Sequence, residues 1–157
     1  MKKLLGILVL SLLWCNISEA SSINYNFKGI KEFKLKVTHD GKCQGESYKK
    51  ELNTTAKYII GNSKIKLSEK ASEYLDIYVL TVSSPGGRIC ASGVEIESYS
   101  VGKIKNSSGN TAYGKITSYQ RKGVMYHDQK DEHKRQVLNQ LDSHLKEFVV
   151  EWMEAQK

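Results

Sequence analysis

The sequence predicts an α+β protein with the element order β-α-β-β-β(-β)-α, a mostly antiparallel sheet with two helices packed on one face. Several segments place apolar residues at every second position, which indicates half-buried strands. Two segments repeat apolar residues every three or four positions, which indicates helices, and glycine-containing turns separate the strands. Helices on one face of a sheet would bury the apolar side of every element.

The first strand and the first helix follow each other closely. Residues 31–38, KEFKLKVT, alternate charged and apolar side chains and predict a strand. After a glycine-containing loop, Ser47 is a suitable helix N-cap, and Gly61 with its following asparagine suits the helix end. The apolar spacing predicts that this helix is buried through Tyr48, Leu52, Thr55 and Ile59.

The centre of the chain reads as a series of strands. A short strand is expected around residues 64–67, and the run YLDIYVLTVS at 74–83 is rich in β-branched and aromatic residues. The turn SPGG reverses the chain into a return strand, where Gly93 predicts a bulge or a close backbone approach. A further strand is expected at residues 112–121.

A long helix is predicted at the C-terminal end, over about residues 128–155. Asp128 is the expected cap, and acidic residues in the first turn suit the helix dipole. One apolar stripe, wide enough to pack on a sheet, consists of Val137, Leu138, Leu141, Leu145, Phe148, Val149, Trp152 and Met153. The opposite face mixes acids and bases, which argues against a membrane-surface helix.

The N-terminal segment has the three parts of a secretory signal peptide. Two lysines precede a twelve-residue apolar run, and small residues flank Glu19. As a helix the run would span about 18 Å, well short of the roughly 30 Å hydrocarbon core. We therefore expect residues 1–20 to be removed after Ala20, leaving residues 21–157 as one α+β domain that is periplasmic or secreted.

Two alternatives to cleavage after Ala20 remain: an uncleaved anchor and a lipid on Cys15. Lipoprotein signals place small residues before the modified cysteine, whereas Leu13 and Trp14 precede Cys15. Cys15 is therefore expected to leave with the leader as an ordinary apolar residue.

The element order resembles that of anticodon-binding-like envelope domains, such as the N-terminal domain of the Tol translocation protein. The chain is also similar to small exported bacterial proteins. The resemblance covers the order of elements in residues 21–157 and implies an envelope protein. It assigns no functional residue.

Two cysteines remain after leader removal, Cys43 and Cys90. In an oxidising compartment, two cysteines in one small domain usually pair, so a structural disulfide is predicted and free thiols are the alternative. The chain has no CxxC motif that would indicate a redox role.

The positive charge is concentrated in one half of the chain. The net charge is +7, and residues 28–70 hold eleven lysines against five acids. These lysines would suit peripheral contact with an anionic surface, although ordinary solvated lysines are the simpler explanation. Nucleic acid is not an expected partner, because the chain has only three arginines and an export signal.

The segment HDQKDEH, residues 127–133, is the one cluster of metal-ligand residue types. On a helix, His127 and Asp131 would share a face and bind zinc or copper weakly, but His133 would lie on another face. A helix N-terminus is rich in acids for capping reasons alone, so no metal is predicted. The sequence has no GxSxG and no phosphate-binding loop, so no cofactor is predicted either.

The leading functional hypothesis is a non-enzymatic exported protein that binds an envelope protein or another envelope component. Lysines and tyrosines, among them Tyr113 and Tyr119, would line the contact surface on an exposed sheet face or edge. The alternative is a small metal-dependent or hydrolytic enzyme built on His127, Asp131 and His133.

Overall fold

A computed structural model describes residues 27–41, 43–45, 47–105 and 107–157. The expected leader and its cleavage site lie outside the described residues. The α+β class and the element order predicted from the sequence are confirmed. The elements are β1 Glu32–Gly41, α2 Ser47–Gly61, β2 Lys66–Leu67, β3 Glu73–Ser83, β4 Cys90–Lys105, β5 Thr111–His127 and α3 Lys130–Ala155.

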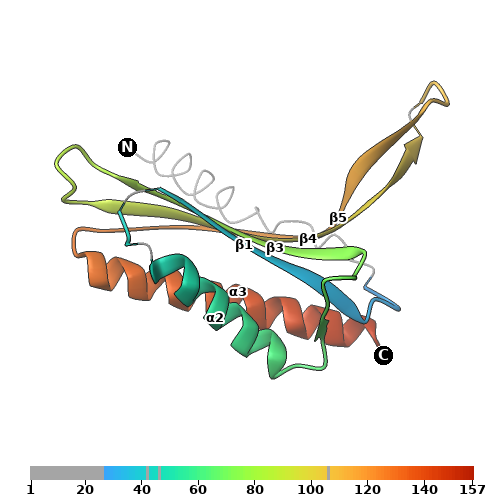
Figure 1. The fold of residues 1–157 in the computed structure, drawn as a ribbon, viewed down its shortest axis with the longest axis horizontal. Coiled ribbons are helices and arrows are strands. Elements are labelled where there is room, and N and C mark those ends of the chain that lie inside the picture. The colour runs from blue at the N-terminus through green and yellow to red at the C-terminus, as the bar shows by residue number, and fades with distance from the viewer. Residues whose placement is uncertain (1–26, 42, 46, 106) are drawn as a thin grey trace, which may run out of the picture.

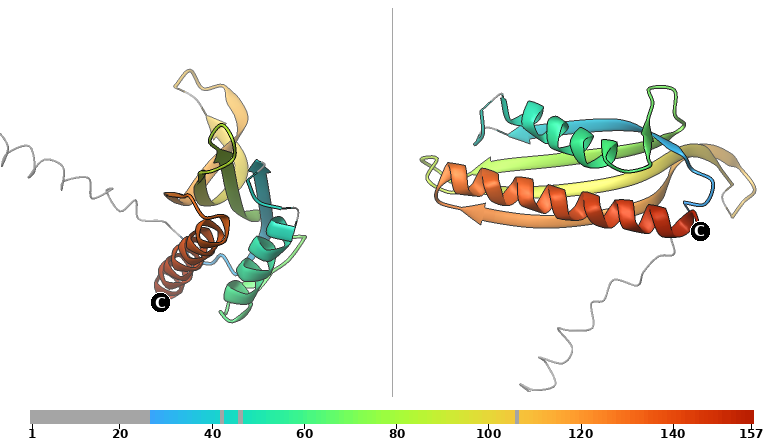
Figure 2. Two further views of the ribbon diagram at one scale, coloured as in Figure 1. Left: turned by 90° about the vertical axis from the view of Figure 1, so that its left-hand side faces the viewer. Right: turned by 90° about the horizontal axis from the view of Figure 1, so that it is seen from below.

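The strands form one sheet in the order β2-β1-β3-β4-β5. β1 is parallel to both β2 and β3, whereas the two longest ladders, β3 with β4 and β4 with β5, are antiparallel. Both helices lie on the same face of this sheet (Figures 1 and 2). No helix in the described part of the chain is long and apolar enough to cross a membrane.

The core lies between the sheet and the two helices. β4 shows the alternation most clearly, because its residues from Cys90 to Ser98 are buried at every second position. The buried stripe of α2 differs in part from the predicted one, since its third and fourth members are Ala56 and Ile60. The predicted Thr55 and Ile59 are only partly buried.

Helix α3 packs its apolar stripe against the sheet but begins later than predicted. Its N-cap is Gln129, whose side chain makes no capping hydrogen bond. The Asp128 cap is therefore wrong: β5 continues to His127, and Asp128 lies between the end of β5 and the N-cap of α3. Met153, expected in the stripe, is exposed. The buried face of α3 consists of His133, Val137, Leu141, His144, Leu145, Phe148 and Trp152.

Strands β4 and β5 are longer than the other strands and project from the sheet. β3 pairs with β4 only as far as Ser100, whereas the β4–β5 ladder continues to the pair Lys105–Thr111. Residues 101–116 therefore form a two-stranded projection, here called the arm (Figure 1). The sequence predicted a shorter last strand and no arm.

A β-bulge lies at the base of the arm, next to Ser98 and Tyr99. The bulge expected at Gly93 is absent, because Gly93 pairs regularly with Leu80 and Val124. No atom lies within 4 Å of the position a Cβ would take on Gly93, so the expected close backbone approach is absent as well.

Candidate functional site

The arm exposes large apolar side chains to solvent. Tyr113 is 74% exposed and Val101 is 59% exposed, and two isoleucines, Ile104 and Ile116, are also exposed. A two-stranded ribbon without a third strand or a covering helix has nothing to bury such residues against. Exposed apolar side chains gathered on one segment often mark an interaction site in soluble proteins.

These apolar residues lie on both faces of the arm. Ile104 and Ile116 continue the helix-side alternation of the sheet, and each isoleucine lies over a glycine of the opposite strand, Gly114 and Gly102 respectively. Val101 and Tyr113 continue the outer face. A partner that covers all four side chains must therefore contact the arm from two sides.

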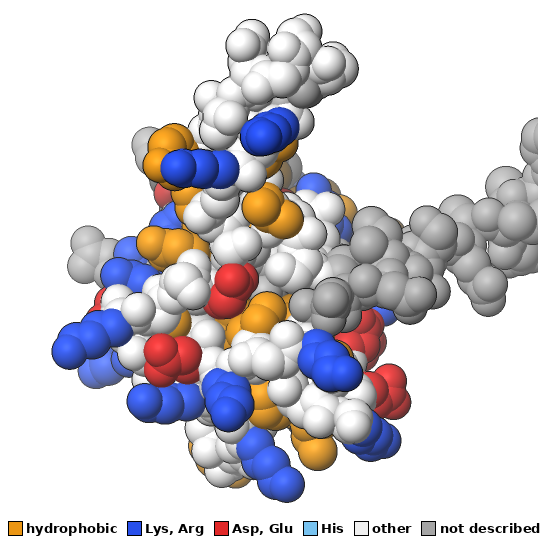
Figure 3. Space-filling model, turned by 90° about the vertical axis from the view of Figure 1, so that its right-hand side faces the viewer, with side chains coloured by type: hydrophobic (Ala, Val, Ile, Leu, Met, Phe, Trp, Pro, Cys, Tyr) orange, Lys and Arg blue, Asp and Glu red, His pale blue; other side chains and the backbone are white. Residues whose placement is uncertain are grey.

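The arm and the strand that follows it carry only positive charge. Residues 98–127 contain three lysines and an adjacent arginine and lysine, but no aspartate or glutamate. Lys115 pairs with Glu97 and lies 4.1 Å from the ring centroid of Tyr99. By contrast, no carboxylate in the described part of the chain forms an ion pair with Lys103 or Lys105. Figure 3 shows basic and apolar side chains gathered along the arm.

Tyr119, predicted to be a surface contact residue together with Tyr113, is instead fully buried. Its hydroxyl donates to the carbonyl oxygen of His144 across 3.3 Å, and its ring packs 5.2 Å from that of Phe148. The bulge explains the error. Because Ser118 is an extra residue without a partner on β4, the side-chain alternation of β5 reverses between Thr117 and Tyr119. Tyr113 consequently lies outside and Tyr119 inside.

The sheet face opposite the helices holds a second set of exposed apolar residues, at the end away from the arm: Leu80, Val82, Val124 and Tyr126. The charged residues between this set and the arm are neutralised by ion pairs. Lys36 pairs with Asp76 at 3.0 Å and Lys122 with Glu95 at 3.2 Å. This face therefore lacks the unpaired positive charge that distinguishes the arm.

The lysines of residues 28–70 do not form one basic face. Those in the described part of the chain are distributed over β1, α2, β2 and the connecting loops. Lys34 pairs with Glu69 at 3.2 Å, and Lys66 pairs with Glu32 at 3.4 Å.

The three candidate metal ligands lie on different elements. His127 ends β5, and its Nδ1 accepts a hydrogen bond of 3.0 Å from the backbone N–H of Gln129. Asp131 is exposed on the first turn of α3, while His133 is fully buried. The helical spacing argument fails because His127 belongs to a strand. Within the described ranges, no group of three His, Cys, Asp or Glu residues could hold a metal ion.

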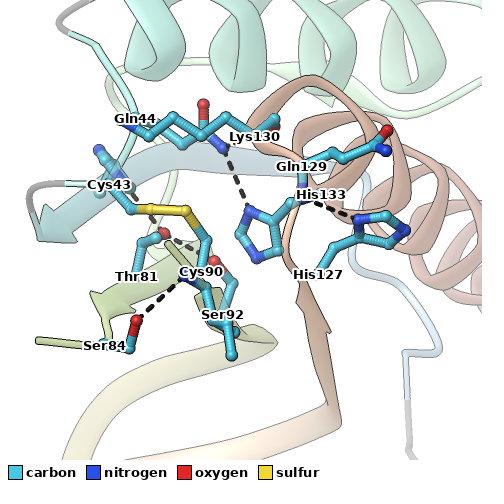
Figure 4. The surroundings of a disulfide bond; sticks show 12 residues. Cys43, Gln44, Thr81, Ser84, Cys90, Ser92, His127, Gln129, Lys130 and His133 are labelled. Atoms are coloured by element: carbon cyan, nitrogen blue, oxygen red, sulfur yellow. Dashed lines mark hydrogen bonds between the residues drawn. A yellow bond between two sulfur atoms is a disulfide. The ribbon is translucent and has the colours of Figure 1, made fainter. Parts of the chain in front are cut away.

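His133 instead belongs to a hydrogen-bonded cluster around the disulfide (Figure 4). Its Nδ1 lies 3.1 Å from the side-chain nitrogen of Gln44, which also donates to the carbonyl oxygen of Lys130. Burial lowers the pKa of His133 below its ordinary value, because the charged imidazolium would lose its hydration. The neutral ring is therefore a packed structural group.

Cys43 and Cys90 form the disulfide that the sequence predicts, with Cα atoms 6.0 Å apart. The bridge joins the loop after β1 to the first residue of β4. Beside it, the hydroxyls of Thr81 and Ser92 are hydrogen-bonded at 2.7 Å (Figure 4). We call the region of the bridge, Thr81, Ser92 and His133 the disulfide end.

Comparisons with known proteins identify no family. No protein-family model matches the chain, and no curated protein matches it. Among solved structures, a minor lipoprotein from Acinetobacter baumannii is 15% identical, with 77% of this chain and 82% of that chain covered and a TM-score of 0.30. Rare lipoprotein B from Shewanella oneidensis is 10% identical, with coverages of 79% and 92% and a TM-score of 0.26.

TM-scores this low do not establish a shared fold, so the function is argued from the residues of this chain. The two solved structures also give no support to the resemblance to the Tol domain.

Proposed function

We propose that the protein is a non-enzymatic, exported binding protein of the bacterial envelope, and that its arm inserts into an acidic groove of a partner protein. The observation that carries the proposal is the arm itself, with exposed apolar side chains on both faces and no acidic residue. Export rests on the leader sequence, with cleavage expected after Ala20.

The two-sided apolar surface favours a protein groove over a lipid surface. A flat bilayer contacts one face of a ribbon, whereas a groove covers both faces. The tip of the arm is also polar, since the described residues 107–110 are two serines, a glycine and an asparagine. Such a tip brings no large apolar side chain into a hydrocarbon layer.

Charge complementarity indicates an acidic partner. Lys103 and Lys105 lie on the strand next to the exposed Val101 and Ile104. Carboxylates on the groove would pair with these ammonium groups and accelerate association at low salt. Tyr113 is the expected energetic centre, because exposed aromatic residues dominate binding energy at many interfaces.

A pull-down with matched tyrosine variants tests this function. The bait is the exported protein. Its intact mass should equal that of residues 21–157 without an attached lipid. Tyr113→Ser removes the aromatic ring from the arm, and the control, Tyr58→Ser, removes a ring that is 72% exposed on α2. We expect wild type and the Tyr58→Ser variant to capture the same acidic envelope protein, and the Tyr113→Ser variant to lose it.

The captured protein is then purified and titrated. Tyr113→Ser should weaken its affinity by about 30-fold or more, the effect of removing a central interface residue. Binding should also weaken as salt increases. Equal affinities for both tyrosine variants would contradict the proposal. So would retention of the wild type on vesicles of phosphatidylglycerol with no protein captured, because that result would make the partner a lipid surface.

A further inference from the structure

A cavity of about 780 Å³ opens at the same end of the molecule as the base of the arm. Its walls come from the loop before β1, from β2 and the loop preceding it, from the start of β3 and from the end of α3. Glu73 connects the two features, because it lines the cavity and pairs with Ser100 just before the arm begins. The cavity volume is in the range of small-molecule sites.

The wall formed by residues 27–31 is held in place by the end of α3. The indole N–H of Trp152 donates to the carbonyl oxygen of Ile30 across 2.7 Å. The side-chain amide of Gln156 donates to the carbonyl oxygen of Phe27, also across 2.7 Å. The cavity is therefore formed before any ligand arrives, which lowers the entropic cost of binding.

The rim of the cavity carries two lysines without a counter-ion. Lys66 is neutralised by Glu32 at 3.4 Å. Lys31 and Lys64 also line the cavity and are exposed, and no carboxylate of the described chain forms an ion pair with either. Two ammonium groups on one rim attract a compact anion, and phosphate is the common choice of such sites.

The same cavity is lined by Glu73, a carboxylate with one oxygen that lacks a hydrogen-bond donor in the described part of the chain. The Oε2 atom of Glu73 is buried and has no partner among the described residues. Burial raises the pKa of this carboxyl, since its charged form has lost hydration without gaining a donor. A ligand with an N–H group that reaches this carboxylate would supply the missing donor.

We propose that this cavity binds an aminoalkyl phosphate, with the phosphate between Lys31 and Lys64 and the ammonium group on Glu73. The lining chemistry requires both charges in one ligand, because an anion alone leaves Glu73 without a donor and an amine alone leaves the lysines without an anion. The phosphoethanolamine group is the smallest common example. It occurs as a free metabolite and as a lipid headgroup, and the cavity is large enough for a substituent on the phosphate.

Calorimetric titration of the mature chain with O-phosphoethanolamine tests the site, with inorganic phosphate and ethanolamine as partial probes. We expect O-phosphoethanolamine to bind about tenfold or more tightly than either partial probe. Glu73→Gln should weaken binding of the zwitterion by about tenfold and leave phosphate binding unchanged. Lys64→Gln should weaken both. The control Lys57→Gln, on an exposed position of α2, should weaken neither.

Three results would overturn the proposal: no binding of O-phosphoethanolamine at about 10 mM, equal binding of phosphate and the zwitterion, or no effect of Glu73→Gln in a variant that melts like wild type. Flotation with phosphatidylethanolamine vesicles, against phosphatidylcholine vesicles, separates the two sources of the group. Retention on phosphatidylethanolamine vesicles but not on phosphatidylcholine vesicles indicates a lipid headgroup. Binding of the soluble compound without retention on either kind of vesicle indicates a free ligand.

The proposed ligand site and the proposed function of the arm can be tested independently, because each variant should affect only one of them. Tyr113→Ser should leave O-phosphoethanolamine binding unchanged, and Glu73→Gln should leave capture of the acidic partner unchanged.

Discussion

The two ends of the sheet differ in how firmly they are packed: one is cross-linked and buried, and the other is an uncovered two-stranded ribbon. At the disulfide end, Cys43, Cys90 and His133 are buried and bonded to neighbouring elements. At the arm, Val101 and Tyr113 protrude from two strands that no helix covers. Stability within a protein is concentrated where buried contacts and cross-links are dense, and binding segments belong to its less stable parts. The comparison therefore predicts that the disulfide end contributes more to the stability of the protein than the arm does.

The largest expected effect comes from breaking the bridge. Cys43→Ser or Cys90→Ser should lower the free energy of unfolding by about 2–5 kcal/mol, because the unfolded chain loses the constraint of a long closed loop. Urea unfolding of each variant, and of the wild type with and without reductant, measures this change.

The double variant Cys43→Ser/Cys90→Ser is the matched control, since reductant should leave its stability unchanged. In whatever fraction stays folded, capture of the partner by the arm should persist. A bridge variant that unfolds at the same urea concentration as the wild type would show that the disulfide end does not carry the stability.

Acid should lower the stability of the folded protein by a smaller amount. Burial lowers the pKa values of His39, His133 and His144 below the ordinary value of 6.5. Below about pH 6.5 the unfolded chain therefore binds more protons than the folded protein. The free energy of unfolding should fall as the pH falls from 6.5 through the lowered pKa values of the folded state.

Glu73, beside the arm, makes the free energy of unfolding depend on pH in the opposite direction. Burial raises the pKa of its carboxyl above 4.5, so its contribution to stability is present at low pH and is lost as the pH rises through the raised value. NMR titration of the histidine rings, combined with urea unfolding between about pH 7.5 and 5, checks the histidine prediction. Titration of His39, His133 or His144 above 6.5 in the folded protein would contradict it.

Shortening the arm should have the smallest effect on stability. Residues 103–113 can be replaced by Asn-Gly, because Gly102 and Gly114 are paired and a two-residue turn closes such a hairpin. We expect the free energy of unfolding to change by no more than about 0.5 kcal/mol, since the removed side chains are exposed or contact only the arm. Capture of the acidic partner should be lost.

Thermal unfolding and the pull-down are measured on the same shortened protein. A loss of several kcal/mol would mean that the arm is part of the folded core, and the contrast between the two ends would then be wrong. If the shortened protein still captures the partner, the binding surface lies outside the removed part of the arm.

The sequence by itself determined the fold class, the element order and the pairing of Cys43 with Cys90. Each depends on local periodicity or on composition: alternation indicates strands, helical spacing indicates helices, and the two cysteines outside the expected leader have one possible pairing. Boundaries were less accurate. The last strand was expected at 112–121, but it runs from Thr111 to His127, because residues 122–127 continue the pairing with β4 as far as Cys90.

Only the tertiary structure decided which side chains are available. One extra residue at the bulge reverses the alternation of β5, so Tyr113 is exposed and Tyr119 is buried although their separation is even. The cavity depends on residues as far apart as Lys31 and Trp152, which no local pattern connects. Local periodicity indicates which side chains each element tends to bury. Only packing determines where a strand extends beyond its neighbours, or which residues from distant parts of the chain line the same cavity.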